Sequence, residues 1–337
     1  MLLVQVSVKS EDTTLSHLTH QYPRWYVEAR DAFEPDFQAH VRKWAAEPIA
    51  SAIYDAINPG RRVRPTLYYA LWKCSKGTYP AITEILPAIA VELFHSASIV
   101  VDDIADGELT RRNKAPLFRL YDVDTAILVS HHLVARGCEA LLRHPRGSEL
   151  SIIWMGCYAL AIRGQLMNLR RFASLSLAEQ QVQSLNKTLP FFSFLAQSLN
   201  ICLEKPGEDL LEILRHLGWC FQVSNDVVDL VSFESLARHD SSSIYLLPPS
   251  FLVPVLVEEG QVQTHEVCSR ITNDRYLEIS LAAQTLVGRT DSFLQTLFQS
   301  ACEAIEKAQI LSCERNIAVD FVKETTKPSF WLHYHGA

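Results

Sequence analysis

The sequence predicts an all-α protein. Its 337 residues include only 12 glycines, and no Asn-Gly or Asp-Gly turn lies between alternating strands. Apolar residues instead recur at steps of three and four, as they do along a helix with one buried face. Segments of helix length are separated by breaks rich in Pro, Gly or polar residues, at residues 58–65, 76–80, 143–148, 204–209 and 246–250. Without an internal repeat or an obvious linker, residues 1–337 are expected to form a single all-α domain.

Two segments show this periodicity most clearly. In residues 81–106, apolar side chains follow helical steps at Ile82, Ile85, Leu86, Ile89, Leu93, Ala97 and Val100. In residues 208–231 they do so at Leu210, Leu214, Leu217, Phe221 and Val228. Each segment is predicted to be a long helix with one face against the core.

Composition excludes several classes of function. The chain has 31 basic and 38 acidic residues, a net charge of -7, so it offers no basic surface for a nucleic acid. Its eight cysteines are scattered without a C-x-x-C pair, which indicates reduced thiols in a cytoplasmic protein. The first residues lack the apolar core of a signal peptide, and nowhere do about eighteen apolar residues run together. We therefore expect no membrane-spanning helix.

The stretch "SIVVDDIADGELTRRNKAP", residues 98–116, places acidic side chains at the end of an apolar helix. On a helix, Asp102 and Asp106 share one face, Asp103 lies beside them, and His95 lies two turns earlier. A solvated helix end is one interpretation. The preceding apolar residues favour burial, and clustered buried carboxylates need a compensating cation. Mg²⁺ prefers such oxygen ligands and leaves positions for phosphate oxygens, which predicts a phosphorylated substrate.

A second polar face lies about 120 residues later, in "FQVSNDVVDL". Read alone it could be structural, but two such helices facing each other could hold magnesium ions around a diphosphate. Guanidinium groups suit phosphate oxygens and would balance the remaining charge. The polar residues of the second face are Gln222, Asn225, Asp226 and Asp229, and the arginines are Arg61, Arg62, Arg64, Arg111 and Arg112.

These motifs, in this order, resemble the all-trans isoprenyl diphosphate synthases. "GRRVRP" is similar to the family's G-K-R-x-R-P loop, "LFHSASIVVDDIAD" to its first aspartate-rich motif, and "RRNKAP" to the element that follows. "GQLMNL", "NKTLPFF" and "GWCFQVSNDVVDL" are similar to three later elements. The resemblance covers about residues 28 to 250, with residues 1–27 as a poorly matched N-terminal extension. It implies a single bundle of long antiparallel helices around a deep central cavity.

The resemblance also implies an activity, the condensation of isopentenyl diphosphate with an allylic diphosphate, in a protein that is commonly a homodimer. It implies that the isopentenyl diphosphate is held by Arg61, Arg62, His95 and Arg112. It implies that the allylic substrate is held by Arg111, Lys187, Thr188 and Gln222, with Asp102, Asp106, Arg111 and Lys187 in the catalytic centre. Up to three Mg²⁺ ions would be bound by Asp102, Asp103, Asp106, Asn225, Asp226 and Asp229.

The sequence departs from the family pattern at several positions. Asn225 replaces the first aspartate of the second motif, and the segment after Asp229, "LVSFESLARHDSSSIYLLPP", lacks the lysines usual there. Two alternatives follow: a class I terpene cyclase of this descent, or a non-catalytic partner subunit. The retained Arg62, His95 and Arg112 favour elongation over cyclisation, and the intact first motif disfavours the subunit.

The first-motif helix also predicts product length. The growing chain should pass the small Ser98 and Ala97 and then meet Phe94, about one turn further down. A bulky ring at that depth predicts a C15 to C20 product.

Overall fold

The computed structural model describes residues 22–44, 46, 48–58, 60–108, 111, 114–170, 177–205, 208–231, 244–245, 247, 250, 252–289 and 291–325. Helices make up nearly all of this part of the chain, which confirms the predicted class. The α-helices are α1 (Arg24–Val41), α2 (Ala50–Ile57), α3 (Val63–Lys76), α4 (Leu86–Asp106), α5 (Leu117–Leu120), α6 (Val123–Leu142), α7 (Gly147–Arg170), α8 (Leu177–Leu203), α9 (Glu208–Val231), α11 (Leu252–Glu258), α12 (Asn273–Arg289), α13 (Asp291–Lys307) and α14 (Ser312–Thr325). The short 3₁₀ helices are η2 (Arg42–Trp44) and η3 (Thr264–Cys268), and the strands β1 (Ile244–Tyr245) and β2 (Ile271–Thr272) pair antiparallel.

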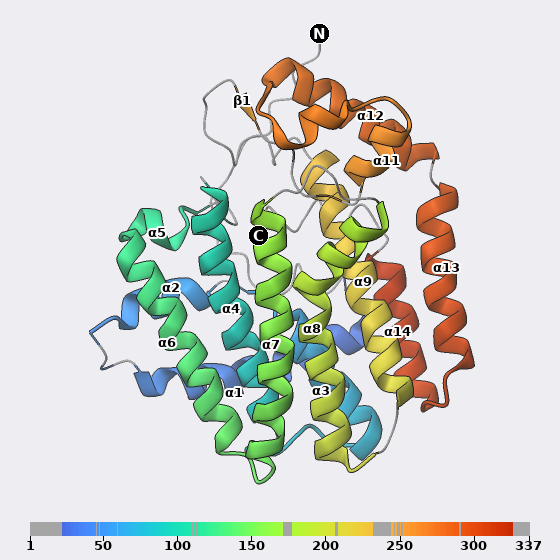
Figure 1. The fold of residues 1–337 in the computed structure, drawn as a ribbon. Helices are drawn as coiled ribbons and strands as arrows, with labels where there is room; N and C mark the ends of the chain where they lie inside the picture. The colour runs from blue at the N-terminus through green and yellow to red at the C-terminus, as the bar shows by residue number, and fades with distance from the viewer. Residues whose placement is uncertain are drawn as a thin grey trace, which may run out of the picture.

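The long helices α4, α6, α7, α8 and α9 run up and down beside one another (Figure 1). Helix α4 packs against α6, α7 against α8, and α8 against α9, while α13 and α14 cover α9. Because successive helices alternate in direction, the C-terminal ends of α4 and α9 lie at the same end of the bundle as the N-terminal end of α8 (Figure 1). Both predicted acidic motifs are therefore carried to one end of the molecule.

The two predicted long helices are present. The bounds of α9 coincide with the predicted segment 208–231. Helix α4 begins at Leu86, later than predicted, with Pro87 in its first turn, where the missing N–H has no helical partner to lose. It ends at Asp106 because Gly107 adopts the left-handed conformation, with a φ of 65°.

The core divides into two clusters of buried apolar side chains. The larger spans α1 to α9 with α13 and α14 and includes the fully buried Trp154 and Phe94. The smaller lies around the C-terminal end of α9, the two strands, α11 and α12. Phe298 of α13 packs against both clusters.

Helix α7 is more apolar than the sequence analysis anticipated. Over Gly147–Met167 it is long and apolar enough to cross a membrane, by length and composition, and no other helix of the described residues is. Only 28% of its most apolar window is buried within the chain's own fold. Much of this helix thus presents apolar side chains that the described residues leave uncovered.

Candidate active site

The first acidic motif occupies the last turns of α4. Asp103 is buried, Asp102 is half-buried and Asp106 is exposed. A helix C-terminus carries partial negative charge, so carboxylates there are unfavourable unless cations lie nearby. This end of α4 is therefore a site that attracts positive charge.

Arg111 supplies one such cation. Its guanidinium donates two hydrogen bonds to Oδ1 of Asp103, one of them from Nε at 2.8 Å, and it lies 3.8 Å from Glu108. Burial raises the pKa of Asp103, although Arg111 lowers it. Burial lowers the pKa of Arg111, but the carboxylates of Asp103 and Glu108 raise it by more. Two residues expected to bind different partners, a metal and a diphosphate, thus contact each other here.

Lys187 of α8 supplies a second cation. Its Nζ lies 3.2 Å from Oδ2 of Asp102. Burial raises the pKa of Asp102; the ammonium of Lys187 opposes this shift and the nearby carboxylate of Asp106 adds to it. Asp102 is thus a carboxylate for which further positive charge would be favourable.

The next residue of α8 connects to the second motif. The Thr188 hydroxyl donates to Oε1 of Gln222 on α9, and the Gln222 amide donates to Oδ1 of Asp226 at 2.5 Å. Asp226 is buried and Asn225 is half-buried on the same helix. Consecutive residues of α8 therefore link Asp102 of the first motif with Asp226 of the second. We call these five residues, Asp102, Lys187, Thr188, Gln222 and Asp226, the polar bridge.

Some expected site residues lie outside the described residues. They are Arg112, the side chain of Asp229, and most of the segment after Asp229 in which lysines are missing.

The backbone at Lys187 is set by a close helix crossing. A Cβ on Gly164 of α7 would lie 2.5 Å from the carbonyl carbon of Asn186 and 2.6 Å from the backbone nitrogen of Lys187. Only glycine allows the two backbones to approach this closely. Pro190, inside α8, has no N–H to bond the carbonyl of Asn186 in the helical pattern. Gly164 thereby lets α7 fix the backbone position of Lys187, and with it this part of the polar bridge.

Replacing Gly164 with alanine should lower the free energy of unfolding by about 1–3 kcal/mol, because the new methyl group meets backbone atoms that cannot rotate away. The matched control is Gly156→Ala on the same helix, where a Cβ would meet nothing within 4 Å. That substitution should raise stability by up to about 1 kcal/mol through helix propensity. Urea denaturation of both variants measures the difference, and equal effects of the two changes would contradict the crossing.

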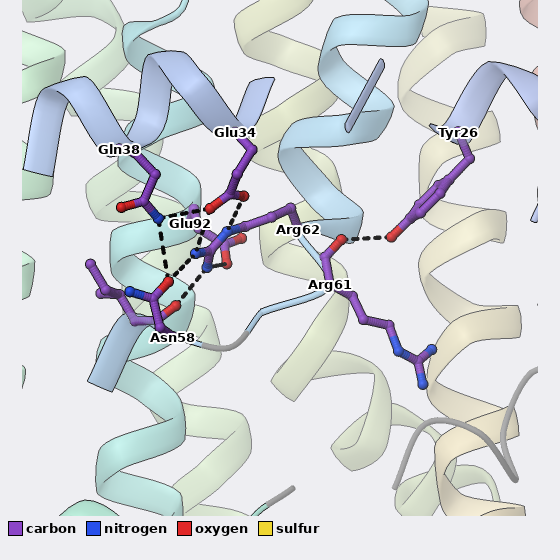
Figure 2. A network of polar contacts seen from close by, with 8 residues as sticks. Tyr26, Glu34, Gln38, Asn58, Arg61, Arg62 and Glu92 are labelled. Atoms are coloured by element: carbon purple, nitrogen blue, oxygen red, sulfur yellow. Dashed lines mark hydrogen bonds and ion pairs between the residues drawn. The ribbon is translucent and has the colours of Figure 1, made fainter. Parts of the chain in front are cut away.

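The basic loop before α3, residues 60–62, directs the side chains of Arg61 and Arg62 to different places. Arg62 is buried and turned toward Glu34 of α1 and Glu92 of α4, whereas Arg61 points away from them (Figure 2). The charge of Arg62, which was expected to hold a diphosphate, is balanced here by the buried Glu92 and the half-buried Glu34. Arg61 is fixed through its backbone, whose carbonyl accepts a 2.6 Å hydrogen bond from the Tyr26 hydroxyl.

The sequence placed Arg64 among the arginines that suit phosphate, but the resemblance gave it no substrate role; in the structure it shares a contact with His95. The two residues contact the same ring: the Cζ of Arg64 is 5.2 Å from the Phe191 centroid, and the His95 ring lies edge-on to it at 6.0 Å. Phe191 stands one helical turn after Lys187 on α8. The available signal for Arg64 in the sequence was its place in the basic segment, three residues after Arg61 and next to Pro65. To decide whether Arg62 or Arg64 faces the substrate, the partners of each side chain had to be known.

The carboxylate and amide oxygens of the two motifs suit a hard cation, although they do not form a complete set of metal ligands by themselves. No group of three or more His, Cys, Asp or Glu side chains within the described residues is placed to hold a metal. Mg²⁺, however, uses only one or two carboxylates and takes its remaining ligands from water and substrate phosphates. The repulsion between Asp102 and Asp106, at a helix C-terminus, is the feature that a divalent ion would relieve.

Below the acidic turn, the helix packs on aromatic rings. Phe94 is fully buried and stacks on Trp154 of α7, with centroids 3.7 Å apart, and Tyr158 extends the stack. Gly137 of α6 closes the other side, since a Cβ there would lie 2.5 Å from the Phe94 ring. Phe94 is thus held as a rigid aromatic wall between α4, α6 and α7.

Comparisons with known proteins point to one family. Residues 46–275 match the polyprenyl synthetase family. A short chain isoprenyl diphosphate synthase of Methanocaldococcus jannaschii is 31% identical over 183 residues, which are 51% of this chain and 54% of that protein. A geranylgeranyl diphosphate synthase of Cereibacter sphaeroides is 30% identical over 203 residues, 58% of this chain and 69% of that protein. The chain thus spans about half to two thirds of the length of these relatives.

A solved structure shows the same fold. The geranylgeranyl pyrophosphate synthetase of Pyrococcus horikoshii superposes with a TM-score of 0.72 at 21% identity, covering 90% of this chain and 98% of that one. The ordered motifs, the two acidic helix ends and the match over residues 46–275 agree, so the chain belongs to the polyprenyl synthetase family.

Proposed function

We propose that the protein is a Mg²⁺-dependent prenyltransferase that condenses isopentenyl diphosphate with an allylic diphosphate to give a C15 to C20 trans-prenyl diphosphate. The observation that carries this proposal is the polar bridge. It joins two acidic helix ends with one lysine, one hydroxyl and one amide between them, which is the donor and acceptor set that a metal-bound diphosphate needs.

Each group of side chains has a proposed role. The bound ions would lower the charge that develops on departing pyrophosphate. Lys187, Thr188, Gln222 and Arg111 would orient the allylic diphosphate, and His95, Arg61 and Arg112, joined by Arg64, would orient isopentenyl diphosphate. Buried rings such as Phe191 would exclude water from the allylic cation. The proposed ligands for up to three Mg²⁺ ions are Asp102, Asp103, Asp106, Asn225, Asp226 and Asp229.

The assay that tests this function supplies purified protein with Mg²⁺ and geranyl or farnesyl diphosphate, with and without isopentenyl diphosphate. Longer prenyl diphosphates that form only when both substrates are present would support the proposal. Hydrocarbons or alcohols formed from the allylic substrate alone would favour a terpene cyclase, and no product in either case would favour a partner subunit.

Replacing Phe94 with alanine should lengthen the main product by at least one five-carbon unit, because it removes the ring that ends the path along α4. Chromatography of the dephosphorylated products measures the change. The matched control is Phe33→Ala, which removes an equally buried ring on α1 that contacts Phe37 and Tyr69. An unchanged product from Phe94→Ala would refute the assignment of Phe94 as the wall.

We also propose that the protein is a homodimer through the apolar faces of α6 and α7. These adjacent helices carry a row of exposed apolar side chains at helical spacing: Val123, Ile127 and Leu128 on α6, and Ile152, Met155, Ile162 and Leu166 on α7. Ile152 keeps 75% of its surface exposed. Exposed apolar side chains gathered on two neighbouring helices are typical of a subunit interface.

The double substitution Ile152→Glu and Ile162→Glu should convert this dimer to a monomer, because it buries charge in the interface. Light scattering coupled to gel filtration measures the mass. Leu281→Glu serves as the control and should remain dimeric, because Leu281 is 61% exposed on α12, a helix that packs against α9 and α13. A monomeric wild-type protein, or one that requires lipid vesicles or detergent to cover α7, would contradict this interface.

A further inference from the structure

We propose that Arg62 is a positioning residue of the isopentenyl diphosphate subsite and not a ligand of the phosphates. It would act by fixing the basic loop against α4, so that Arg61, Arg64 and His95 keep their positions relative to one another. This inference rests on the proposed function, since it concerns how the same site binds one of its two substrates.

The donors of Arg62 are fully used within the protein. A guanidinium has five N–H donors, and the structure gives this one five hydrogen bonds. Two bonds go to Glu34: Nε donates to Oε2 at 3.0 Å and Nη2 donates to Oε1 at 3.3 Å. Nη1 donates to the Ile57 carbonyl at 2.7 Å and to Oε1 of Glu92 at 2.9 Å. Nη2 also donates to Oδ1 of Asn58 at 2.9 Å. The side chain is 1% exposed. A phosphate could reach Arg62 only after these bonds were broken.

The bonds of Arg62 join three separate helices. Glu34 belongs to α1, Ile57 and Asn58 end α2, and Glu92 belongs to α4, one turn before His95. The Phe37 ring lies 4.5 Å from the guanidinium and completes the enclosure. The group therefore ties the basic loop to the turn of α4 that precedes His95.

The backbone at Arg62 shows why this anchor matters for its neighbours. Its φ is 59°, a left-handed conformation that residues other than glycine rarely adopt. Such a conformation persists only where surrounding contacts enforce it. This turn directs Arg61 and Arg62 in opposite directions (Figure 2). The Tyr26 hydroxyl holds the Arg61 carbonyl from the other side at 2.6 Å, and the Arg62 carbonyl accepts the Thr66 N–H at the start of α3. The orientation of Arg61 and the start of the helix that carries Arg64 therefore depend on this anchor.

The sign of a charge effect separates this role from a ligand role. Glu34→Ala removes a negative charge close to a site for an anion, so electrostatics alone would tighten isopentenyl diphosphate binding. If Arg62 is an anchor, the same change removes two of its five bonds and should weaken binding instead. We expect the KM for isopentenyl diphosphate to rise about three- to tenfold, with the KM for the allylic diphosphate unchanged.

Tyr26→Phe tests the same anchor with less perturbation, because it deletes a single hydroxyl. It should also raise the KM for isopentenyl diphosphate alone, about threefold or more. The matched controls are Tyr68→Phe, which deletes a hydroxyl that donates to the Glu84 carbonyl at 2.9 Å, and Glu28→Ala, which removes a surface charge from α1. Neither control should change either KM.

The outcomes distinguish failure of the inference from failure of the function. If the wild-type protein does not elongate an allylic diphosphate with isopentenyl diphosphate, the proposed function fails. If the wild-type protein elongates but Glu34→Ala and Tyr26→Phe keep or lower the KM for isopentenyl diphosphate, the anchor is refuted. A rise of both KM values together would show general loosening and would also overturn it.

Discussion

Replacing Asp102 with asparagine should lower kcat for elongation about 10²- to 10³-fold. The substitution keeps the shape of the side chain but removes a charge from the acidic end of α4, where Asp102 is the carboxylate of the polar bridge that meets Lys187 at 3.2 Å. Electrostatic groups that stabilise the charge on a leaving group typically contribute effects of this size. Steady-state assays at saturating substrates measure kcat, and a titration with Mg²⁺ should show a higher half-saturating concentration.

The control for this change is Asp31→Asn, at an exposed carboxylate on α1. It makes the same chemical change and should leave kcat and the Mg²⁺ requirement at wild-type values. Thermal unfolding provides a second measurement: Mg²⁺ with pyrophosphate should raise the Tm of the wild-type protein through mass action, and this rise should shrink in Asp102→Asn. An Asp102→Asn protein with wild-type kcat and an undiminished Tm rise would contradict the metal site.

Local sequence patterns predicted the helices that carry the site. The apolar spacing of residues 208–231 matches α9, because that helix buries one continuous stripe against α8 and the C-terminal helices. The start of α4 was predicted less well. The apolar spacing of residues 81–85 continues the pattern of the helix, but the regular helix begins only at Leu86, with Pro87 in its first turn. Periodicity reports which face is buried, whereas a helix start depends on the capping backbone.

The partners of the site residues could not be predicted in the same way. The positions of Asp102, Lys187 and Gln222 followed from motifs, but the contacts Asp102–Lys187 and Thr188–Gln222 join residues far apart in the chain. Arg62 and Arg64 differ by two positions in one short basic segment, and nothing in that segment says which of them is held by carboxylates. Glu34 and Glu92 decide this, and both lie in helical stretches where a glutamate is usually a solvated residue.

Replacing Arg62 with methionine should lower the free energy of unfolding by about 3–5 kcal/mol. The change leaves Glu92, which is only 4% exposed, without the cation that balances it, and a buried charge that loses its partner is strongly destabilising. Chemical denaturation measures the loss. The control, Arg24→Met, makes the same substitution at an exposed ion pair with Glu28 and should be close to neutral. A second change, Glu92→Leu, should restore much of the stability lost in Arg62→Met, because a buried pair can be replaced by apolar side chains at little cost.

The loss in Arg62→Met should also depend on pH, through Glu34. Burial raises the pKa of Glu34, but hydrogen bonding and charge from Arg62 lower it by more, so that its pKa lies below the ordinary value of 4.5. A carboxyl group whose pKa is lowered on folding adds stability above its unfolded pKa and loses it as the pH falls through the folded value. In the variant both contributions of Arg62 are lost, while burial still raises the pKa of Glu34 and only the smaller contributions of Gln38 and Arg30 still lower it. The ionised form of Glu34 is therefore less favourable in the folded variant than in the folded wild type. The gap in unfolding free energy between wild type and variant should therefore be widest near neutral pH and narrow as the pH falls below about 4.5; a gap that stays constant across this range would show that Arg62 does not stabilise the ionised form of Glu34.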